Sequence, residues 1–221
     1  MSQYVLLSHI LKQDTPSYGN RDRVIIRVNS CIRGGETANS SCLVLSNNHI
    51  GTHIDVPRHF SDSGKKTTDY LIGDYVFEKC QVIDVPCNEP KLIGDADLIG
   101  LKKDIEILLI RTGYESKRGT DEYWNNNPGL SPELADYLRE NCPNLRCVGF
   151  DFISITSWMH RAEGRLAHKA FLVPDNGGRE IWAIEDMSLA NIPNNIIKRV
   201  IVAPLLVEDG NGTAVTVIAE Y

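Results

Sequence analysis

The sequence predicts a mixed α/β fold in which one substantial sheet dominates. Segments with the apolar patterning of strands outnumber helical ones, and the clearest helix stands between two of the strand-like segments. The chain has 221 residues, of which 42% are hydrophobic and 24% charged, as is typical of one globular domain. It contains no internal repeat, low-complexity tract or linker-like segment, so we expect residues 1–221 to form a single domain.

Three strand-like segments occupy the first part of the chain. Residues 4–10 are a short apolar segment, and residues 24–29 and 41–46 also carry strand-like apolar patterns. The stretch between them at 30–41 is rich in Ser, Gly and Asn and predicts a loop. The strand at 41–46 leads into residues 49–60, and we expect it to hold that stretch on a rigid element.

The rest of the chain alternates strands with helical segments. The best helix begins after Ser131, a good N-cap residue, with Pro132 at the first helical position and a stop at Pro143. Residues 158–171 have mixed helical character. We expect strands at residues 82–85, 105–110, 147–150 and 181–184, and a closing pair at 200–207 and 213–219.

Composition excludes several classes of protein. No apolar run approaches the roughly 20 residues of a membrane span, and the N-terminus lacks the features of a signal peptide. The net charge is −6 and there is no dense Lys/Arg stripe, which argues against a nucleic-acid partner. Because no secretory signal is recognised, we expect the six cysteines to be reduced thiols in a cytoplasmic protein. No two of them form a C-x-x-C pair, which argues against a thiolate zinc site or a thioredoxin-like centre.

Residues 49–60 concentrate the chemistry of the chain in the pattern H-x3-H-x-D-x3-H. The polar members of this pattern are His49, His53, Asp55 and His59. Imidazole and carboxylate are the usual ligands of zinc, so the cluster predicts a metal site. A glycine, β-branched residues and a proline disfavour a helix here. In an extended chain His53 and Asp55 share a face, and a bend at Gly51 can bring His49 toward them.

Further ligands must come from distant positions. The remaining histidines are His9, His160 and His168, of which His168 adjoins an apolar segment. Glu185 ends a predicted strand, so His168 and Glu185 are the candidate additional ligands. Tyr18 lies among turn-forming residues and is either a surface side chain or a wall for a small planar ligand.

The motif His49-x-Gly51-Thr52-His53-x-Asp55-x-Pro57-x-His59-Phe60 resembles the signature of the metal-dependent cyclase-like hydrolases. That family includes the bacterial kynurenine formamidases and the isatin hydrolases. The resemblance extends along nearly the whole chain. It includes the segments Leu7-Ser8-His9, Leu109-Ile110-Arg111-Thr112-Gly113, Gly149-Phe150-Asp151 and Ile184-Glu185, together with His168.

The resemblance implies a swivelling β/β/α-type fold, assembled as a homodimer or a dimer of dimers. It also implies one or two divalent ions, zinc or alternatively manganese. The implied metal ligands are His49, His53, Asp55, His168 and Glu185. His59 would be the catalytic acid/base and not a ligand, and Tyr18 would contact the substrate.

The function that follows is hydrolysis of a small amide, such as an N-formyl arylamine, by metal-activated water. His59 would protonate the leaving nitrogen, because histidine titrates near neutral pH. One alternative is a hydrolase of a cyclic amide or lactam of the isatin type. A second is a metal-stabilised binding protein without turnover, in which an unligated His59 would have no use.

Overall fold

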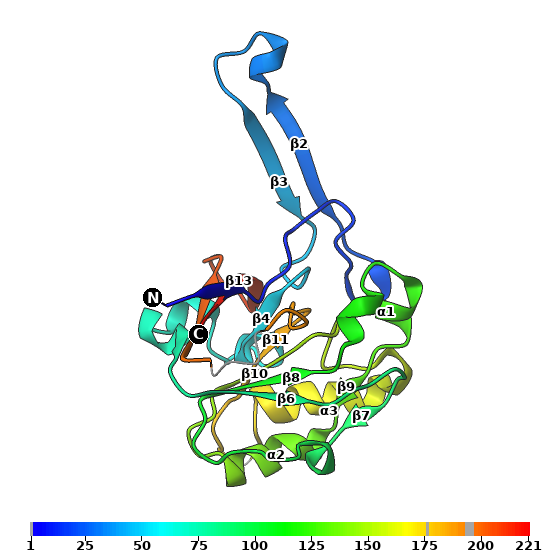
Figure 1. Ribbon diagram of the computed structural model, residues 1–221, viewed down its shortest axis with the longest axis vertical. Helices are drawn as coiled ribbons and strands as arrows, with labels where there is room; N and C mark the ends of the chain where they lie inside the picture. Colours follow the sequence, from blue (N-terminus) through cyan, green and yellow to red (C-terminus); the bar gives the residue numbers. More distant parts are fainter. Residues whose placement is uncertain (1, 176, 193–196) are drawn as a thin grey trace.

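A nine-stranded mixed sheet runs through the computed structural model, which describes residues 2–175, 177–192 and 197–221 (Figure 1). The strand order is β5-β12-β13-β4-β11-β10-β8-β6, and β1 also pairs with β13. The strands are β1 (Tyr4–Leu6), β4 (His53–Asp55), β5 (Val76–Phe77), β6 (Cys80–Asp84), β8 (Ile107–Arg111), β10 (Cys147–Phe150), β11 (Trp182–Glu185), β12 (Arg199–Pro204) and β13 (Gly212–Glu220). The predicted fold class is confirmed.

The sheet changes direction at β4. Strands β6, β8, β10 and β11 are mutually parallel, whereas β4 runs antiparallel to both β11 and β13. The three-residue β4 therefore joins the parallel half of the sheet to the antiparallel half. This position places residues of the histidine-rich stretch in the interior of the sheet.

Two helices cover the parallel strands on one side, below them in Figure 1. They are α2 (Pro132–Asn141) and α3 (Arg161–Leu172), and they pack against each other. The Ser131 hydroxyl accepts the Leu134 N–H at 3.3 Å, which confirms the predicted N-cap of α2. The predicted segment 158–171 is a 3₁₀ turn at Trp158–His160 followed by α3. A shorter helix, α1 (Asp121–Asn125), lies apart from this pair.

Apolar cores lie on both faces of the sheet. Leu108 and Ile110 of β8 belong to the core under the helices, and Ile107 and Leu109 belong to the opposite one. All four side chains are fully buried. A strand covered on both faces has no polar side, which explains why residues 107–110 of the strand predicted at 105–110 are all apolar.

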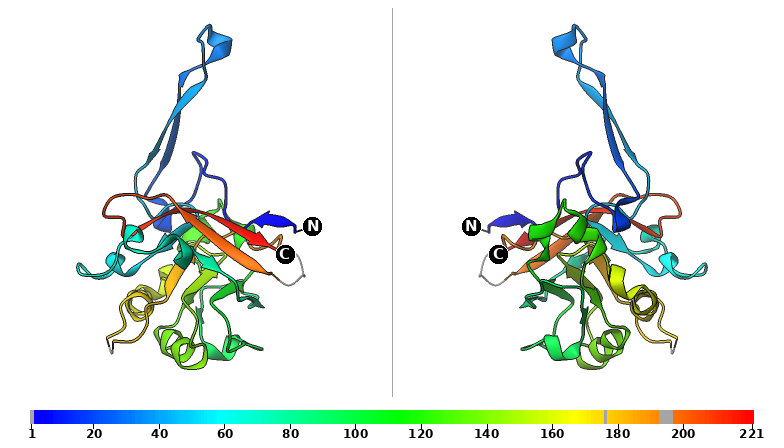
Figure 2. Two further views of the ribbon diagram at one scale, coloured as in Figure 1. Left: turned by 90° about the vertical axis from the view of Figure 1, so that its left-hand side faces the viewer. Right: turned by 90° about the vertical axis from the view of Figure 1, so that its right-hand side faces the viewer.

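The hairpin of β2 (Val24–Ser30) and β3 (Ser40–Leu45) projects far from the rest of the molecule (Figures 1 and 2). We call it the arm. Both strands were predicted, but the expectation that strand 41–46 rigidly holds the histidine-rich stretch is wrong. β3 pairs only with β2 in the described residues, whereas His53 and Asp55 lie on β4. The remaining small sheet pairs β7 (Leu92–Ile93) with β9 (Gly129–Leu130).

Other differences concern element ends. The first strand stops at Leu6, short of the predicted residue 10, and β12 stops at Pro204, short of 207.

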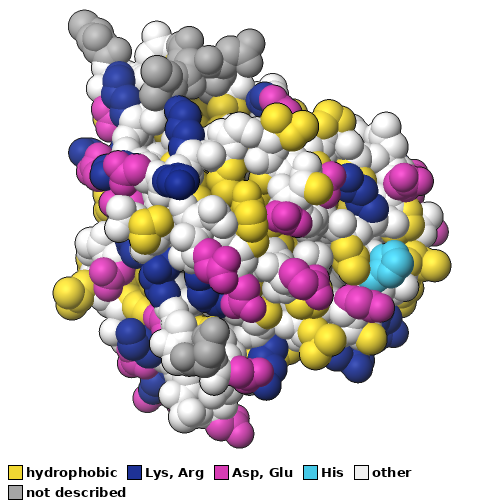
Figure 3. All heavy atoms as spheres, turned by 90° about the horizontal axis from the view of Figure 1, so that it is seen from below, with side chains coloured by type: hydrophobic (Ala, Val, Ile, Leu, Met, Phe, Trp, Pro, Cys, Tyr) yellow, Lys and Arg dark blue, Asp and Glu magenta, His cyan; other side chains and the backbone are white. Residues whose placement is uncertain are grey.

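All six cysteines are free thiols, as predicted. Seen from below, Lys and Arg side chains are interspersed with Asp and Glu (Figure 3). Within the described ranges, no helix has the length and apolar character needed to cross a membrane.

Candidate metal centre

The antiparallel strands β4 and β11 set the positions of His53, Asp55 and Glu185. In the ladder between β4 and β11, Glu185 lies directly opposite His53, so their side chains share a face. Asp55 stands two residues after His53 and points to the same side. The His53 Nε2 atom lies 3.3 Å from Glu185 Oε2 and 3.6 Å from Asp55 Oδ1. All three side chains are buried.

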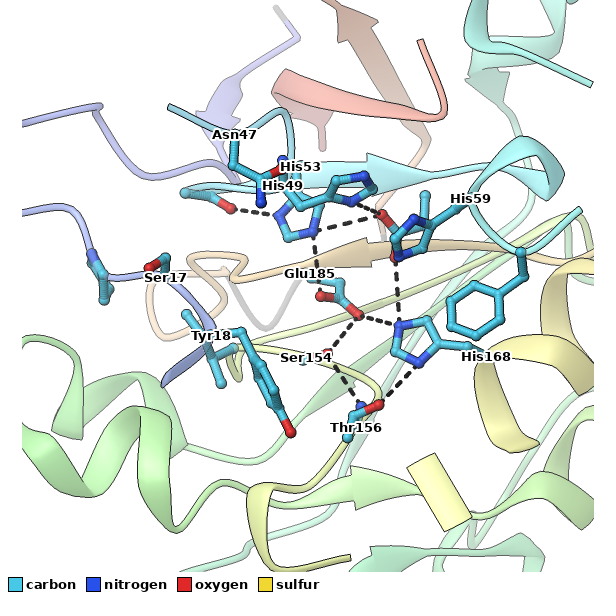
Figure 4. A pocket seen from close by; sticks show the side chains of 15 residues that line it. Ser17, Tyr18, Asn47, His49, His53, His59, Ser154, Thr156, His168 and Glu185 are labelled. Carbon is cyan, nitrogen blue, oxygen red and sulfur yellow. Dashed lines mark hydrogen bonds and ion pairs between the residues drawn. The ribbon is translucent and has the colours of Figure 1, made fainter. Parts of the chain in front are cut away.

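A second histidine reaches the same carboxylates from the opposite side (Figure 4). His168 projects from α3, and its Nε2 lies 3.4 Å from Glu185 Oε1 and 3.6 Å from Asp55 Oδ2. Each carboxylate thus turns one oxygen toward His53 and the other toward His168. Two ligand atoms on one tetrahedral zinc ion with bonds of about 2.0–2.1 Å lie about 3.4 Å apart, so these separations suit metal ligation.

Backbone carbonyls fix both histidine rings. The Nδ1–H of His53 donates to the Gly51 carbonyl at 2.8 Å. The Nδ1–H of His168 donates to the Gly164 carbonyl at 3.0 Å, and the Thr156 hydroxyl lies at the same distance. This pattern leaves each Nε2 free to face the carboxylates, as in metal sites whose histidines donate the other N–H to a carbonyl.

One oxygen of Asp55 lacks a hydrogen-bond partner within the described residues and fits a cation. Its Oδ2 atom is buried and has no hydrogen-bond partner among the described residues. A buried carboxylate oxygen without a partner is costly, and a bound cation is a common explanation. Burial opposes ionisation of Asp55, but His49, His59 and His168 outweigh it and hold the pKa well below its usual range. The donor set and the unpartnered oxygen fit a divalent ion.

Glu185 is held in the same ionised state. Its Oε1 accepts the Ile155 N–H at 2.7 Å and the Ser154 hydroxyl at 3.3 Å. Burial and Asp55 oppose ionisation, yet the neighbouring His168 and His53 lower the pKa of Glu185 to about 2. A permanently ionised carboxylate at this position is available as a ligand at neutral pH.

His49 approaches the cluster from the loop before β4. Its Nδ1 lies 2.7 Å from Asp55 Oδ1 and its Nε2 lies 2.8 Å from Asn211 Oδ1. Gly51 has φ +68°, which makes the predicted bend. Gly212 permits the close approach, because a Cβ there would lie 2.4 Å from His49 Cε1.

His59 lies over this cluster on a 3₁₀ turn at Pro57–His59, and not on the extended strand that alternation alone would continue. Its ring stacks on that of His49 with centroids 4.0 Å apart. Burial, with further contributions from His49 and His168 against that of Asp55, lowers the pKa of His59 to about 4. The ring is therefore neutral at pH 7 and able to accept a proton. Nitrogen and oxygen atoms of His49, Asp55 and His59 also come within 4.8 Å of one another, so His59 is not remote from the ligand set.

A cavity of about 230 Å³ opens onto the cluster. Tyr18, on the turn Tyr18–Asn20, lines it and packs against Trp158 with ring centroids 5.1 Å apart. The Tyr18 hydroxyl is buried and has no hydrogen-bond partner in the described chain. Phe60 stacks on His168 at 4.9 Å and closes part of the wall. The cavity is large enough for a small planar molecule that supplies a polar partner to Tyr18.

The structure brings all seven candidate residues to this cavity: His49, His53, Asp55, His59, His168, Glu185 and Tyr18. The two other histidines do not line it. The His9 backbone N–H donates to Thr52 Oγ1 at 2.9 Å, and His160 belongs to the 3₁₀ turn before α3.

One supporting group escaped the sequence analysis. Asp186, next to Glu185, has φ +53°, a conformation that is uncommon outside glycine. Its carboxylate accepts two hydrogen bonds from Arg118 at 2.9 and 2.8 Å and one from the Tyr123 hydroxyl. Its carbonyl accepts the Thr52 hydroxyl at 2.5 Å. These bonds tie the loop before β4 to the end of β11, and the only signal in the sequence was the Glu185-Asp186 pair.

Comparisons with known proteins agree with this geometry. Residues 5–157 match the sequence model of the Cyclase family, described as "Putative cyclase". The chain therefore belongs to the cyclase family, which confirms the predicted membership. Kynurenine formamidase of Bacillus mycoides (strain KBAB4) is 31% identical over 155 residues, covering 70% of this chain and 70% of that protein. Cyclase-like protein 1 of Arabidopsis thaliana is 24% identical over 194 residues, covering 84% and 72%.

Solved structures share the whole fold. Isatin hydrolase A from Labrenzia aggregata superposes with a TM-score of 0.77 at 22% identity, covering 99% of this chain and 93% of that one. A potential metal-dependent hydrolase with cyclase activity superposes with a TM-score of 0.75 at 19% identity, covering 100% and 98%. At these identities the likeness concerns the fold.

Proposed function

We propose that this protein is a metal-dependent hydrolase of a small amide, an N-formyl arylamine such as N-formylkynurenine. The observation that carries the proposal is the pair of buried carboxylates, each facing His53 with one oxygen and His168 with the other. A relative that is 31% identical over 155 residues is a kynurenine formamidase, which supports this substrate class.

The proposed ligands are those predicted: His49, His53, Asp55, His168 and Glu185. Together with Asp55 and Glu185, the histidines would hold one or two divalent ions, with zinc as the expected metal and manganese as the alternative. Such ions lower the pKa of bound water to about 7 and polarise a carbonyl. His49 holds the Asp55 carboxylate and would complete the ligand set.

His59 is the proposed proton-transfer residue. Its neutral ring can take a proton from the attacking water and give it to the departing amine, which is a poor leaving group without protonation. The unpartnered Tyr18 hydroxyl would hydrogen-bond the substrate, and the Tyr18 ring would lie along its planar part. His168 and Phe60 limit the space on the opposite wall.

The test is elemental analysis of the purified protein, followed by assays with each metal added back. N-formylkynurenine, formanilide and isatin are the substrates to compare. We expect stoichiometric zinc or manganese and turnover of the formamides. Preferential opening of the isatin ring would favour the lactam alternative. Bound metal without turnover of any amide would favour a binding protein.

We also propose that residues 1–221 form one domain that assembles as a homodimer or larger oligomer. The arm supports the assembly, because an isolated two-stranded hairpin is only marginally stable in water. Its exposed apolar side chains include Val28 (73% exposed), Ile32 (56%) and Leu43 (53%). At its base an apolar groove of about 560 Å³ runs beside β12 and β13, and a second copy of the chain would cover both. We place the protein in the cytoplasm, in keeping with its free thiols.

A further inference from the structure

A second cavity, of about 350 Å³, lies away from the metal centre. Trp182 begins β11 and lines this cavity, whereas Glu185 ends the same strand and lines the other. Their positions are three residues apart, about 10 Å along a strand, and their side chains point to opposite faces of the sheet. We call this second cavity the Trp182 pocket. It is a separate site and not an extension of the metal centre.

The Trp182 pocket is lined by charged residues of both signs. The basic ones are Arg146, Arg179 and Lys65, and the acidic ones are Asp74 and Glu180. The Arg179 guanidinium donates to the carbonyls of Leu145 at 2.7 Å and Cys142 at 3.0 Å, so it is oriented by neutral acceptors. No carboxylate within the described ranges pairs with it. Its charge is therefore fixed in place and free to attract an anion.

Arg146 is positioned in the same way. It donates to the carbonyls of Asp74 at 2.5 Å and Val76 at 3.0 Å and lies over the Phe77 ring. The nearest carboxylate is that of Glu106, at 3.7 Å, beyond hydrogen-bond distance. The third cation, Lys65, lies near Glu180, which also accepts the Tyr70 hydroxyl at 2.8 Å. Arg146 and Lys65 therefore each have an ion-pair partner, whereas no ion pair involves Arg179 among the described residues.

Trp182 supplies a buried hydrogen-bond donor beside the basic groups. Its side chain is 3% exposed, and its indole N–H is buried and makes no hydrogen bond of good geometry in the described structure, although the Tyr70 hydroxyl lies near it. A buried donor that is poorly paired favours a better acceptor. Tyr70 stands against the indole with ring centroids 4.5 Å apart and lines the cavity beside it. The pocket thus combines an aromatic wall, a poorly paired donor and two oriented guanidinium groups.

We propose that the Trp182 pocket binds a small aromatic monocarboxylate. One carboxylate oxygen accepts the Trp182 indole N–H and the other meets the Arg179 guanidinium, whose planar fork suits a carboxylate. The ring of the ligand packs against the Tyr70 side of the cavity. The volume of about 350 Å³ lies at the lower end of the range of small-molecule pockets, about 300–1,000 Å³, and suits a ligand with a single ring.

The experiment uses the full chain loaded with metal and sodium benzoate as the probe. Titration calorimetry measures the affinity, and the indole N–H resonances of ¹⁵N-labelled protein report the location. Trp182→Phe assigns the Trp182 resonance and removes the donor. We expect 1:1 saturable binding that shifts this resonance. Benzamide, which lacks the charge, should bind at least about tenfold more weakly, as for loss of a charge-assisted hydrogen bond.

Matched variants separate this pocket from the rest of the surface. Arg179→Gln should weaken benzoate binding by at least about tenfold, and Arg179→Lys should restore part of the loss. Lys103→Gln removes one charge from an exposed side chain and should change nothing. His59→Asn, in the metal-site cavity, should also leave benzoate binding unchanged.

Three results would overturn the proposal. They are unaltered affinity in Arg179→Gln, loss of binding in His59→Asn, and inorganic phosphate competing as well as benzoate. If Arg179→Gln fails to fold because its contacts with backbone carbonyls are lost, Trp182→Phe becomes the deciding variant. It keeps an aromatic ring at position 182 but removes the indole N–H, so unchanged benzoate affinity in this variant would reject the site.

Discussion

The imidazole rings of His49 and His59 stack with centroids 4.0 Å apart and planes inclined by 28°. His49 simultaneously contacts Asp55 at 2.7 Å. The two rings have different surroundings, because His49 has a partner on each nitrogen, whereas no hydrogen bond involves the His59 ring among the described residues. The stack therefore places His59, the proposed proton-transfer residue, over a ring that contacts the Asp55 carboxylate.

For His59→Asn we expect metal content and melting temperature to persist while kcat on formamides falls by about 10²–10⁴-fold, the usual contribution of general acid–base catalysis. Activated esters need less protonation of the leaving group and should lose less. His160→Asn, outside the cavity, is the control. Loss of metal would make His59 a ligand, and equal losses on amides and esters would indicate substrate positioning.

For His53→Ala we expect bound metal to fall to a small fraction and the melting temperature of the metal-loaded sample to decrease. His53 faces both carboxylates, and metal binding to the native state is linked to folding stability. Elemental analysis and thermal denaturation, with and without a chelator, measure the two effects. His160→Ala serves as the comparison. Full occupancy in His53→Ala would refute the ligand assignment.

Metal binding should strengthen as pH rises. In the metal-free protein, burial opposes protonation of His53 and His168, but Asp55 and Glu185 raise their pKa values to about 9 and about 10. Both rings are thus protonated at pH 7 and must lose a proton to bind metal. The apparent affinity should rise by up to about 100-fold per pH unit between pH 7 and 9, as for release of two protons.

The stability of the metal-free protein should decrease as pH rises, opposite to the trend in metal affinity. Raised histidine pKa values stabilise the fold fully below the unfolded value of 6.5, and this contribution is lost as pH rises through about 9 and 10. Melting temperatures of metal-free and metal-loaded samples should diverge from pH 7 to pH 9. Calorimetry in two buffers of different ionisation enthalpy counts the protons, and absence of proton release would contradict the assignment.

The arm should govern assembly. Changing Val28 and Leu43 together to Glu places charge on its exposed apolar surface and should convert the oligomer to monomer. Sedimentation velocity measures the state, and the melting temperature of the monomer shows whether the body stays folded. Thr37→Glu, in the exposed loop of the arm, is the control. A monomer at micromolar concentration in the unaltered protein would contradict the proposed assembly.

The sequence predicted the parts of the site that depend on neighbouring residues. Alternation in an extended chain correctly put His53 and Asp55 on one face, and the bend at Gly51 was also correct. The contact between His53 and Glu185 depends on which strand lies beside β4, and local patterns carry no record of strand order. Residue type and position made His168 and Glu185 candidate ligands, and the family resemblance then joined them to the set.

The arm shows a different limit of prediction from the sequence. Its strands were predicted correctly, but their apolar residues resemble those of core strands, so nothing distinguished exposed Val28 from a buried valine. The Arg118–Asp186 ion pair joins residues 68 positions apart and was likewise invisible. Both features depend on tertiary arrangement, which local sequence patterns do not record.

The location of β4 also determines when the site can exist during synthesis. The strand is flanked by β11 and β13, so the ribosome releases the histidine-rich stretch long before residues 182–185 and 212–220. Until then the nascent chain carries His49, His53 and Asp55 without the strands that orient them. A metal ion met at that stage would find flexible, partial ligation and exchange readily. If the proposed ligands are correct, tight metal binding therefore requires the finished fold.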